Sequence, residues 1–139
     1  MSGNQAERFS LPDVVPDVAW LDSVESTNDY LASQPPPPTL RAALSWNQTA
    51  GRGRLGRSWT SPAGKSLALS LELGPELMPE ELSDSWRGAL PLVTGADLVG
   101  SLKSVSDGVG LKWPNDVLIE GKKVAGILGQ IPEPQRVII

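Results

Sequence analysis

Leucine alternates with small or polar residues over positions 66–73, where the sequence reads "SLALSLEL". Successive side chains of a strand point to opposite faces, so this period of two predicts a strand with one leucine-lined face. Three other short and mostly apolar segments, "VAWLDSV", "RAALSW" and "GVGLKW", are also expected to form strands. The pattern therefore favours a sheet assembled from segments spread along the chain.

Helix signals occur in two places. The triplet "STN" at 26–28 contains three good N-cap residue types ahead of "DYLAS", and the four prolines at 35–38 must end that helix. Acidic residues in "MPEELSDSWRGA" are typical of a helix start, and Pro91 at a first-turn position predicts a helix that begins there. The proline run favours polyproline II and is interpreted as a stiff spacer, with a ligand for proline-reading domains as the alternative.

The last third of the chain is rich in strand signals. The segment "DVLIEGKKVAGILGQI" predicts a hairpin with its turn at Glu120 and Gly121. The segment "QRVII" begins a further strand, at which the sequence stops. An apolar strand without a neighbour leaves an unpaired edge. We therefore expect the sequence to end within a domain, and we expect the 139-residue chain alone to be poorly stable or inactive.

Length and composition are those of one globular domain. The chain has 139 residues, of which 40% are hydrophobic and 20% are charged. Residues 1–16 are polar and interrupted by proline, which predicts a mobile arm ahead of a domain over 17–139. There is no apolar run long enough to span a bilayer and no signal-peptide pattern, so we expect a cytoplasmic protein without a membrane partner.

Charge and residue usage restrict the chemistry. The formal net charge is −4, which argues against broad electrostatic binding to DNA. The chain has no cysteine and no histidine, which excludes disulfides, thiolate nucleophiles, cysteine-based zinc sites and histidine base catalysis. Any reaction must therefore use lysine, arginine, carboxylates, hydroxyls, amides or a metal held by oxygen.

A basic, glycine-rich loop stands out against this acidic background. In "QTAGRGRLGRSW" at 48–59, three arginines alternate with glycines. Glycines allow backbone N–H groups to curve around an anion, and the guanidinium fork suits phosphate and carboxylate. Since the arginines alternate, some are expected to face a ligand and others to pack outside. A plain surface hairpin is the alternative, and nucleic-acid binding is disfavoured because the chain is acidic and poor in aromatic residues.

Four segments in this order resemble the catalytic domain of biotin–protein ligases (biotin–[acetyl-CoA-carboxylase] ligases). They are "STN", "GRGRLGRSW", "KWPND" and "KKVAGIL", and the resemblance extends from about Trp20 to the C-terminus. It implies an α/β (α+β) fold with a mixed sheet and flanking helices, related to class II aminoacyl-tRNA synthetases. It also implies that 17–139 is the N-terminal part of the catalytic domain, without the rest of that domain or the small SH3-like domain of the family. We expect no winged helix and no DNA partner, as in monofunctional members.

The resemblance implies an ATP-dependent activity that needs no histidine or cysteine. The carboxylate of biotin attacks ATP to form biotinyl-5′-AMP, and the biotinyl group passes to a lysine of the biotin carrier domain of acetyl-CoA carboxylase or another biotin-dependent carboxylase. Positive charge and positioning are the main requirements of such a step. Mg²⁺ is the expected metal, and a homodimer is one expected assembly.

The resemblance also assigns roles to individual residues. The expected biotin-binding residues are Ser26, Thr27, Asn28, Gln48, Gly51, Arg52, Gly53, Arg54 and Lys123. The expected ATP-binding residues are Arg54, Arg57, Trp59, Lys112, Asn115 and Asp116. Lys123 and Arg54 are the expected catalytic residues, and Asp116 is the expected Mg²⁺ ligand.

Structural interpretations remain open for several of these residues. Residues 26–28 can serve as a helix cap, Trp59 as a core residue, and "PND" as a simple turn. Two functional alternatives also remain: a lipoate or octanoate ligase relative, and a catalytically incomplete biotin-binding fragment.

Overall fold

The computed structural model describes residues 13–78 and 84–139. Its elements, in chain order, are β1 (Asp17–Leu21), α1 (Thr27–Ser33), β2 (Leu40–Ser45), β3 (Gly51–Arg52), the 3-10 turn η1 (Arg54–Gly56), β4 (Ser58–Trp59), β5 (Ala68–Leu73), the 3-10 turn η2 (Pro75–Leu77), α2 (Asp84–Leu102), β6 (Val109–Lys112), β7 (Asp116–Ile119), β8 (Lys122–Gly126), β9 (Gln130–Glu133) and β10 (Arg136–Ile138). The arm expected over residues 1–16 lies outside the described residues except for 13–16.

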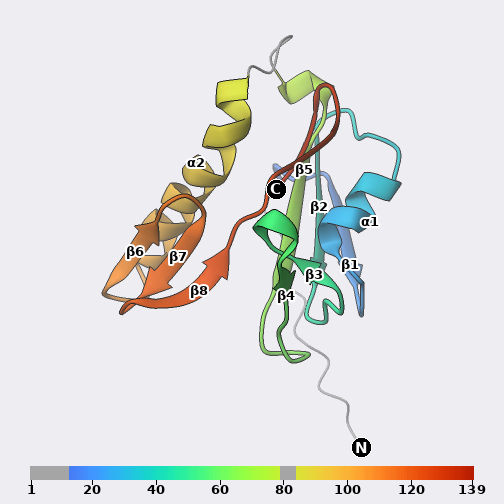
Figure 1. Ribbon diagram of the computed structural model, residues 1–139. Coiled ribbons are helices and arrows are strands. Elements are labelled where there is room, and N and C mark those ends of the chain that lie inside the picture. The colour runs from blue at the N-terminus through green and yellow to red at the C-terminus, as the bar shows by residue number, and fades with distance from the viewer. Residues whose placement is uncertain (1–12, 79–83) are drawn as a thin grey trace, which may run out of the picture.

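The larger sheet has five strands in the order β1-β2-β5-β10-β9. β1 runs parallel to β2, and the other neighbours are antiparallel, so the sheet is mixed. Helix α1 packs on one face, where Leu31 joins Ala43 and Ile138 in a fully buried cluster (Figure 1). Burying such side chains is the main source of stability in a domain of this size.

The strand expected at 66–73 is present as β5, but its leucines do not lie on its more buried face. Ser70 is 1% exposed and Glu72 is fully buried, whereas Leu69 is 45% exposed. The buried face is the polar one because Glu72 accepts a hydrogen bond from Arg136 Nε at 2.5 Å, and Ser70 contacts α1. A buried polar face is tolerated only when its groups find such partners.

A three-stranded sheet contains β6, β7 and β8 in sequence order, and α2 packs against it (Figure 1). Strands β3 and β4 form a separate two-stranded sheet. Gly95 is buried in this contact, since a Cβ added there would come within 2.7 Å of Leu111 Cδ1. The hairpin turn expected at Glu120 and Gly121 is confirmed, and both residues have positive φ, at 48° and 77°. Such angles suit the tight turns that join antiparallel strands.

The helix expected to begin at Pro91 begins earlier. Helix α2 extends over Asp84–Leu102 and contains Pro91 in its interior, so that prediction is wrong. Proline removes one intrahelical hydrogen bond. Packing compensates for part of this loss, because the Pro91 ring lies close to Gly129 in the segment after β8. The part of the acidic start signal at 79–83 lies outside the described residues. Within the described residues, neither α1 nor α2 is long and apolar enough to cross a membrane.

The final strand is not an unpaired edge, contrary to expectation. β10 lies between β5 and β9 and is antiparallel to both. The sequence pattern does not predict β9, whose first two residues, Gln130 and Ile131, fall at the end of the segment expected to form the preceding hairpin. It forms the sheet edge and contains Pro132, a residue that suits an edge position. The physical reason for expecting low stability, an unpaired last strand, is therefore removed.

The proline run after α1 packs against the protein. Pro37 is buried, and the carbonyl of Pro35 accepts a hydrogen bond from Arg41 Nη1 at 2.9 Å. The carbonyl of Pro38 accepts another from Glu76 N at 3.2 Å. These contacts favour the spacer interpretation over a freely presented ligand for another domain.

Candidate active site

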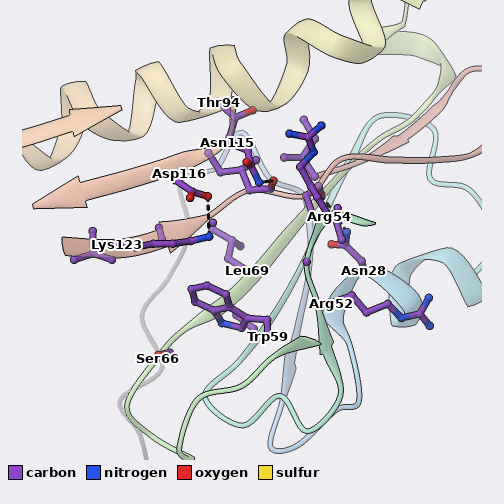
Figure 2. Close-up of a pocket in the computed structure, with 18 of the residues that line it drawn as sticks. Asn28, Arg52, Arg54, Trp59, Ser66, Leu69, Thr94, Asn115, Asp116 and Lys123 are labelled. Atoms are coloured by element: carbon purple, nitrogen blue, oxygen red, sulfur yellow. Dashed lines mark hydrogen bonds and ion pairs between the residues drawn. The ribbon is translucent and has the colours of Figure 1, made fainter. Parts of the chain in front are cut away.

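A pocket of about 920 Å³ is bordered by the five-stranded sheet, by the three-stranded sheet and by the hairpin of β3 and β4. It draws on segments that are distant in sequence, including the start of α1, strand β5, and the hairpin β7–β8 (Figure 2). The residues expected from the sequence that line it are Ser26, Thr27, Asn28, Gln48, Arg52, Gly53, Arg54, Arg57, Trp59, Lys112, Asn115, Asp116 and Lys123. Gly51 is the one expected residue that does not line this pocket.

One end of the pocket is formed by the start of α1. Ser26 is the N-cap of this helix, and its Oγ accepts a hydrogen bond from Asp29 N at 3.3 Å. The capping interpretation of this triplet is therefore correct for Ser26. Thr27 and Asn28 are buried and also line the pocket, so capping and ligand binding are compatible here.

Gln48 is held against α1 from the opposite side. Its Oε1 accepts hydrogen bonds from Thr27 N at 2.9 Å and from Thr27 Oγ1 at 3.3 Å. Gly51 makes room for this arrangement, because a Cβ at that position would collide with the Gln48 amide and lie 2.7 Å from Trp59 O. Gly51 therefore affects the pocket indirectly, because the absence of a side chain there allows Gln48 to lie close to its backbone.

Ser70 is a site residue that the sequence reasoning missed. It lies on β5 beneath α1, and its Oγ donates to Thr27 Oγ1 at 2.7 Å and also contacts Asn28 Oδ1. It lines the same pocket. The sequence signal that could have identified Ser70 is the alternation of side chains along β5, which places Ser70 on the face opposite the leucines. A serine there needs a buried polar partner.

The basic loop is a β-hairpin, as the simpler alternative suggested. β3 pairs with β4, and Gly53 N donates to Arg57 O at 2.7 Å, so this N–H is not available to an anion. Gly53 N is therefore not one of the backbone N–H groups that could curve around an anion. Leu55 and Gly56 occupy the tip with positive φ of 58° and 73°.

The loop arginines differ in their ion pairing, although all three line the pocket. Arg52 Nη2 lies 2.5 Å from Asp29 Oδ2, and Figure 2 shows Arg52 turned away from Lys123. Arg54 lines the pocket and forms no ion pair with any described residue. Arg57 also lines the pocket and forms no ion pair with any described residue, so the charges of Arg54 and Arg57 are more available to a ligand than that of Arg52.

The other end of the pocket carries opposite charges and an aromatic ring. Lys123 Nζ lies 2.7 Å from Asp116 Oδ1 and 5.2 Å from the centroid of the Trp59 ring (Figure 2). The Lys123 side chain is 40% exposed and that of Asp116 is 20% exposed. Trp59 borders the pocket and is not a member of the buried core cluster. A ligand anion can approach this lysine from solvent.

Asn115 forms the corner between β6 and β7. Its Nδ2 donates to Ile127 O at 3.0 Å, and its carbonyl accepts from Ile127 N at 3.0 Å. The turn-forming interpretation of "PND" is thus correct as well. Leu128, which follows Ile127, accepts a hydrogen bond at its carbonyl from Asn28 Nδ2 at 3.2 Å. The segment at 127–128 therefore joins the β7–β8 side of the pocket to α1.

Carboxylates are sparse in the pocket. Within residues 13–78 and 84–139, no group of three histidine, cysteine, aspartate or glutamate side chains is placed to hold a metal ion. Mg²⁺ keeps several water ligands and is often held by one or two carboxylates together with substrate phosphates. The side chains present therefore fit a metal that arrives with a phosphorylated ligand.

A mixed sheet and a pocket with a hydrogen-bonding end and a charged end define an α+β domain with a candidate small-molecule site. Sequence comparison agrees with this class: the profile of the Biotin/lipoate A/B protein ligase family matches residues 20–131. The chain belongs to that family.

Two relatives illustrate the similarity. The bifunctional ligase/repressor BirA of Escherichia coli (strain K12) is 38% identical over 120 residues, covering 82% of this chain and 35% of BirA. The biotin–[acetyl-CoA-carboxylase] ligase of Mycobacterium tuberculosis (strain H37Rv) is 42% identical over 95 residues, covering 66% of this chain and 34% of that ligase. The chain thus spans about a third of the length of these relatives.

Solved structures show the same fold. The biotin protein ligase of Leishmania major in complex with biotinyl-5-AMP aligns with a TM-score of 0.74 at 27% identity, over 88% of this chain and 55% of that chain. The biotin protein ligase of Aquifex aeolicus in complex with biotin and ATP aligns with a TM-score of 0.71 at 34% identity, over 88% and 49%. The expected fold class is confirmed.

Proposed function

We propose that this chain carries the biotin- and adenylate-binding part of an ATP-dependent biotin–protein ligase. The observation that carries this proposal is the convergence of four separate motifs on one pocket of about 920 Å³. One end of that pocket is neutral and hydrogen-bonding, and the other is charged. Biotin has the same polarity, with a neutral ureido ring at one end and a carboxylate at the other.

The ureido ring is proposed to bind at the start of α1. It offers one acceptor and two donors, which hydroxyl and amide side chains can match. The groups proposed to supply them are Ser26, Thr27, Asn28 and Gln48, all of which line the pocket. The hairpin is proposed to border the ring through Gly51, Arg52 and Gly53. Gly51 is proposed to act indirectly, by allowing Gln48 to lie close to it.

The carboxylate and ATP are proposed to meet at the charged end. An oxygen of the biotin carboxylate attacks the α-phosphorus, the bond to the bridging oxygen of the β-phosphate breaks, and pyrophosphate leaves. Lys123 and Arg54 are the proposed catalytic residues, because both border the pocket and offer fixed positive charge where two anions must approach. Trp59 is proposed to stack on the adenine, with Arg57, Lys112 and Asn115 around the nucleotide.

The adenylate is proposed to be consumed by a lysine of a biotin carrier domain of a biotin-dependent carboxylase. The lysine amine attacks the acyl carbonyl, an amide bond forms, and AMP leaves with the electron pair of the broken acyl–phosphate bond. Both halves of the cycle are group transfers that need no protein nucleophile. This fits a chain without cysteine or histidine.

Mg²⁺ is proposed to accompany ATP. Asp116 is its proposed protein ligand, with phosphate oxygens and water completing the shell. The ion would neutralise phosphate charge. Asp116 also pairs with Lys123, so it orients that ammonium group before any ligand arrives.

A lipoate or octanoate ligase is the main rival, since the matching family profile covers both biotin and lipoate ligases. The buried hydroxyl and amide groups at the start of α1 favour biotin, because a ureido ring can exchange further hydrogen bonds with them, whereas an apolar dithiolane ring or alkyl chain cannot. An apolar ligand would therefore lose affinity at this end of the pocket.

Calorimetric titration of the 139-residue chain with biotin tests the binding step, with lipoate as the matched competitor. Incubation with biotin, ATP and Mg²⁺ then tests the chemistry by release of pyrophosphate, with omission of biotin as the control. We expect saturable biotin binding that lipoate does not displace, and pyrophosphate release only when biotin is present. Biotin binding without pyrophosphate release would identify a binding fragment, and absence of binding would refute the proposal.

A further inference from the structure

The buried face of β5 lies beneath both ends of α1. Ser70 and Glu72 are two residues apart on this strand and therefore share a face. Ser70 contacts the first turn of the helix, and Glu72 binds the arginine that contacts its last turn. With 7 residues, α1 is too short to be stable by itself. Its position depends on what it packs against.

The C-terminal end of α1 is held by Arg136. Arg136 Nη2 donates to the carbonyls of Leu31 at 2.6 Å and Gln34 at 2.9 Å, while its Nε donates to Glu72. A cation at this end satisfies free carbonyls and the helix dipole. This contact is distant from the pocket, since neither Arg136 nor Glu72 lines it.

At the N-terminal end, one hydroxyl group contacts two buried side chains of α1. Ser70 Oγ carries a single hydrogen and is in contact with two acceptors, Thr27 Oγ1 and Asn28 Oδ1. Thr27 in turn donates to Gln48, and Asn28 donates to Leu128 O. Ser70 therefore stands at the centre of a buried network that determines which way these donors and acceptors point.

We propose that Ser70 is a positioning residue for the ureido-binding end of the pocket, acting through Thr27 and Asn28. The inference deepens the proposed function and rests on it. Without the Ser70 hydroxyl, Thr27 Oγ1 and Asn28 Oδ1 each lose a buried partner, and their side chains can rotate to find another. The carboxylate and nucleotide end of the pocket is left unchanged.

Ser70→Ala is the test, and Ser70→Thr is the conservative variant, because it keeps a hydroxyl and suits a strand. Ser33→Ala is the matched control: Ser33 is exposed at the other end of α1, where its Oγ bonds only locally, to Tyr30 O and Gln34 Nε2. If Ser70→Ala does not remain folded at the assay temperature, Ser70→Cys carries the same comparison, since a thiol is a weak donor.

The biotin dissociation constant is expected to rise roughly tenfold in Ser70→Ala, the loss of about one net hydrogen bond. The rate of adenylate formation at saturating biotin is expected to stay within about threefold, because the reacting groups are elsewhere. Ser70→Thr should restore most of the affinity. Equal losses in Ser70→Ala and Ser70→Thr, or an unchanged dissociation constant, would overturn the inference.

A second readout does not need the ligand. In the free protein, the NMR signals of the Asn28 and Gln48 side-chain amides and of Thr27 N–H should shift in Ser70→Ala and stay in place in Ser33→Ala. Unchanged signals would overturn the positioning role. If the wild-type chain binds no biotin, the proposed function fails, and these signals still decide whether Ser70 orders the network.

Discussion

Two of the ion pairs among the described residues, Arg136–Glu72 and Lys123–Asp116, have similar chemistry but differ in burial. Arg136 and Glu72 pair at 2.5 Å beneath α1, with side chains 4% and 0% exposed. Lys123 and Asp116 pair at 2.7 Å beside the pocket, with side chains 40% and 20% exposed. The first pair is sealed by protein, and the second is open to solvent and to any ligand in the pocket.

This difference in burial assigns the two pairs to different tasks. The printed contacts of the buried pair join parts of the fold, and removing Arg136 would leave the buried Glu72 carboxylate with only the more distant guanidinium of Arg41, 3.7 Å away. The open pair contributes little to stability because water screens it. Its lysine can therefore exchange Asp116 for a ligand anion at low cost, which is what a group that binds developing charge requires.

The largest expected effect is on stability. Arg136→Met should lower the free energy of unfolding by about 3–5 kcal/mol, because the buried Glu72 carboxylate loses its shorter ion pair and keeps only Arg41 Nη1 at 3.7 Å. Denaturant titration followed by circular dichroism measures this loss. The double variant Arg136→Met with Glu72→Leu removes both charges and should recover much of it. A double variant no more stable than the single one would show that shape, and not charge, holds this site together.

The open pair should show the reverse behaviour. Lys123→Ala should change the free energy of unfolding by at most about 1 kcal/mol. It should also slow adenylate formation by about 100-fold or more, which corresponds to roughly 2.7 kcal/mol of lost transition-state stabilisation. Pyrophosphate release and thermal unfolding are the two measurements. Lys122→Ala is the matched control, since its side chain is exposed on the same strand and does not line the pocket.

Two of the three loop arginines, Arg52 and Arg54, allow the same comparison between a paired and an unpaired charge. Arg54→Ala should lower the rate of adenylate formation by roughly 10- to 100-fold, the effect of losing a hydrogen bond to a charged group. Arg52→Ala should cost less than about threefold, because Arg52 already pairs with Asp29 at the surface. Rates at saturating biotin and ATP compare the two. Equal losses would mean that the hairpin rearranges when ligand binds.

The smallest expected effect concerns the neutral end. Gly51→Ala would push the added Cβ against Gln48 and the Trp59 carbonyl, so biotin affinity should fall by about fivefold to tenfold through the loss of one hydrogen-bond partner. Both ion pairs stay intact. Calorimetry with biotin measures the change, and Gly100→Ala on α2, where a Cβ meets open space, is the control. An unchanged affinity would argue against a binding role for Gln48.

Local features of the fold followed from sequence. The N-cap at Ser26, the strand β5 and the turn at Glu120 all depend on neighbours within a few residues, and all are present. The start of α2 and the place of β10 did not follow. Both depend on contacts between distant segments: Pro91 packs near Gly129, and β10 inserts between β5 and β9.

The pocket shows the same division. The motifs named every charged residue of its lining except Lys65, because those residues were recognisable from their order and spacing. They did not name the polar lining residues Ser58, Ser61, Ser66, Ser70 and Thr94. Ser70 was missed because a serine in a strand carries no signal until the element above it is known. The partner of Arg52 was missed for the same reason, since Asp29 lies 23 positions away in sequence.

The sequence by itself determined the family resemblance, the mixed α+β class, the local elements and the set of groups available for chemistry. Only the tertiary structure decided which face of β5 is buried, which loop arginine pairs with Asp29, and which ion pair is sealed and which is open. Local elements depend on backbone preferences and on neighbours a few residues apart. Burial and pairing depend on how distant segments pack. Burial makes the Arg136–Glu72 pair a structural contact, whereas exposure leaves the Lys123–Asp116 pair accessible to a ligand.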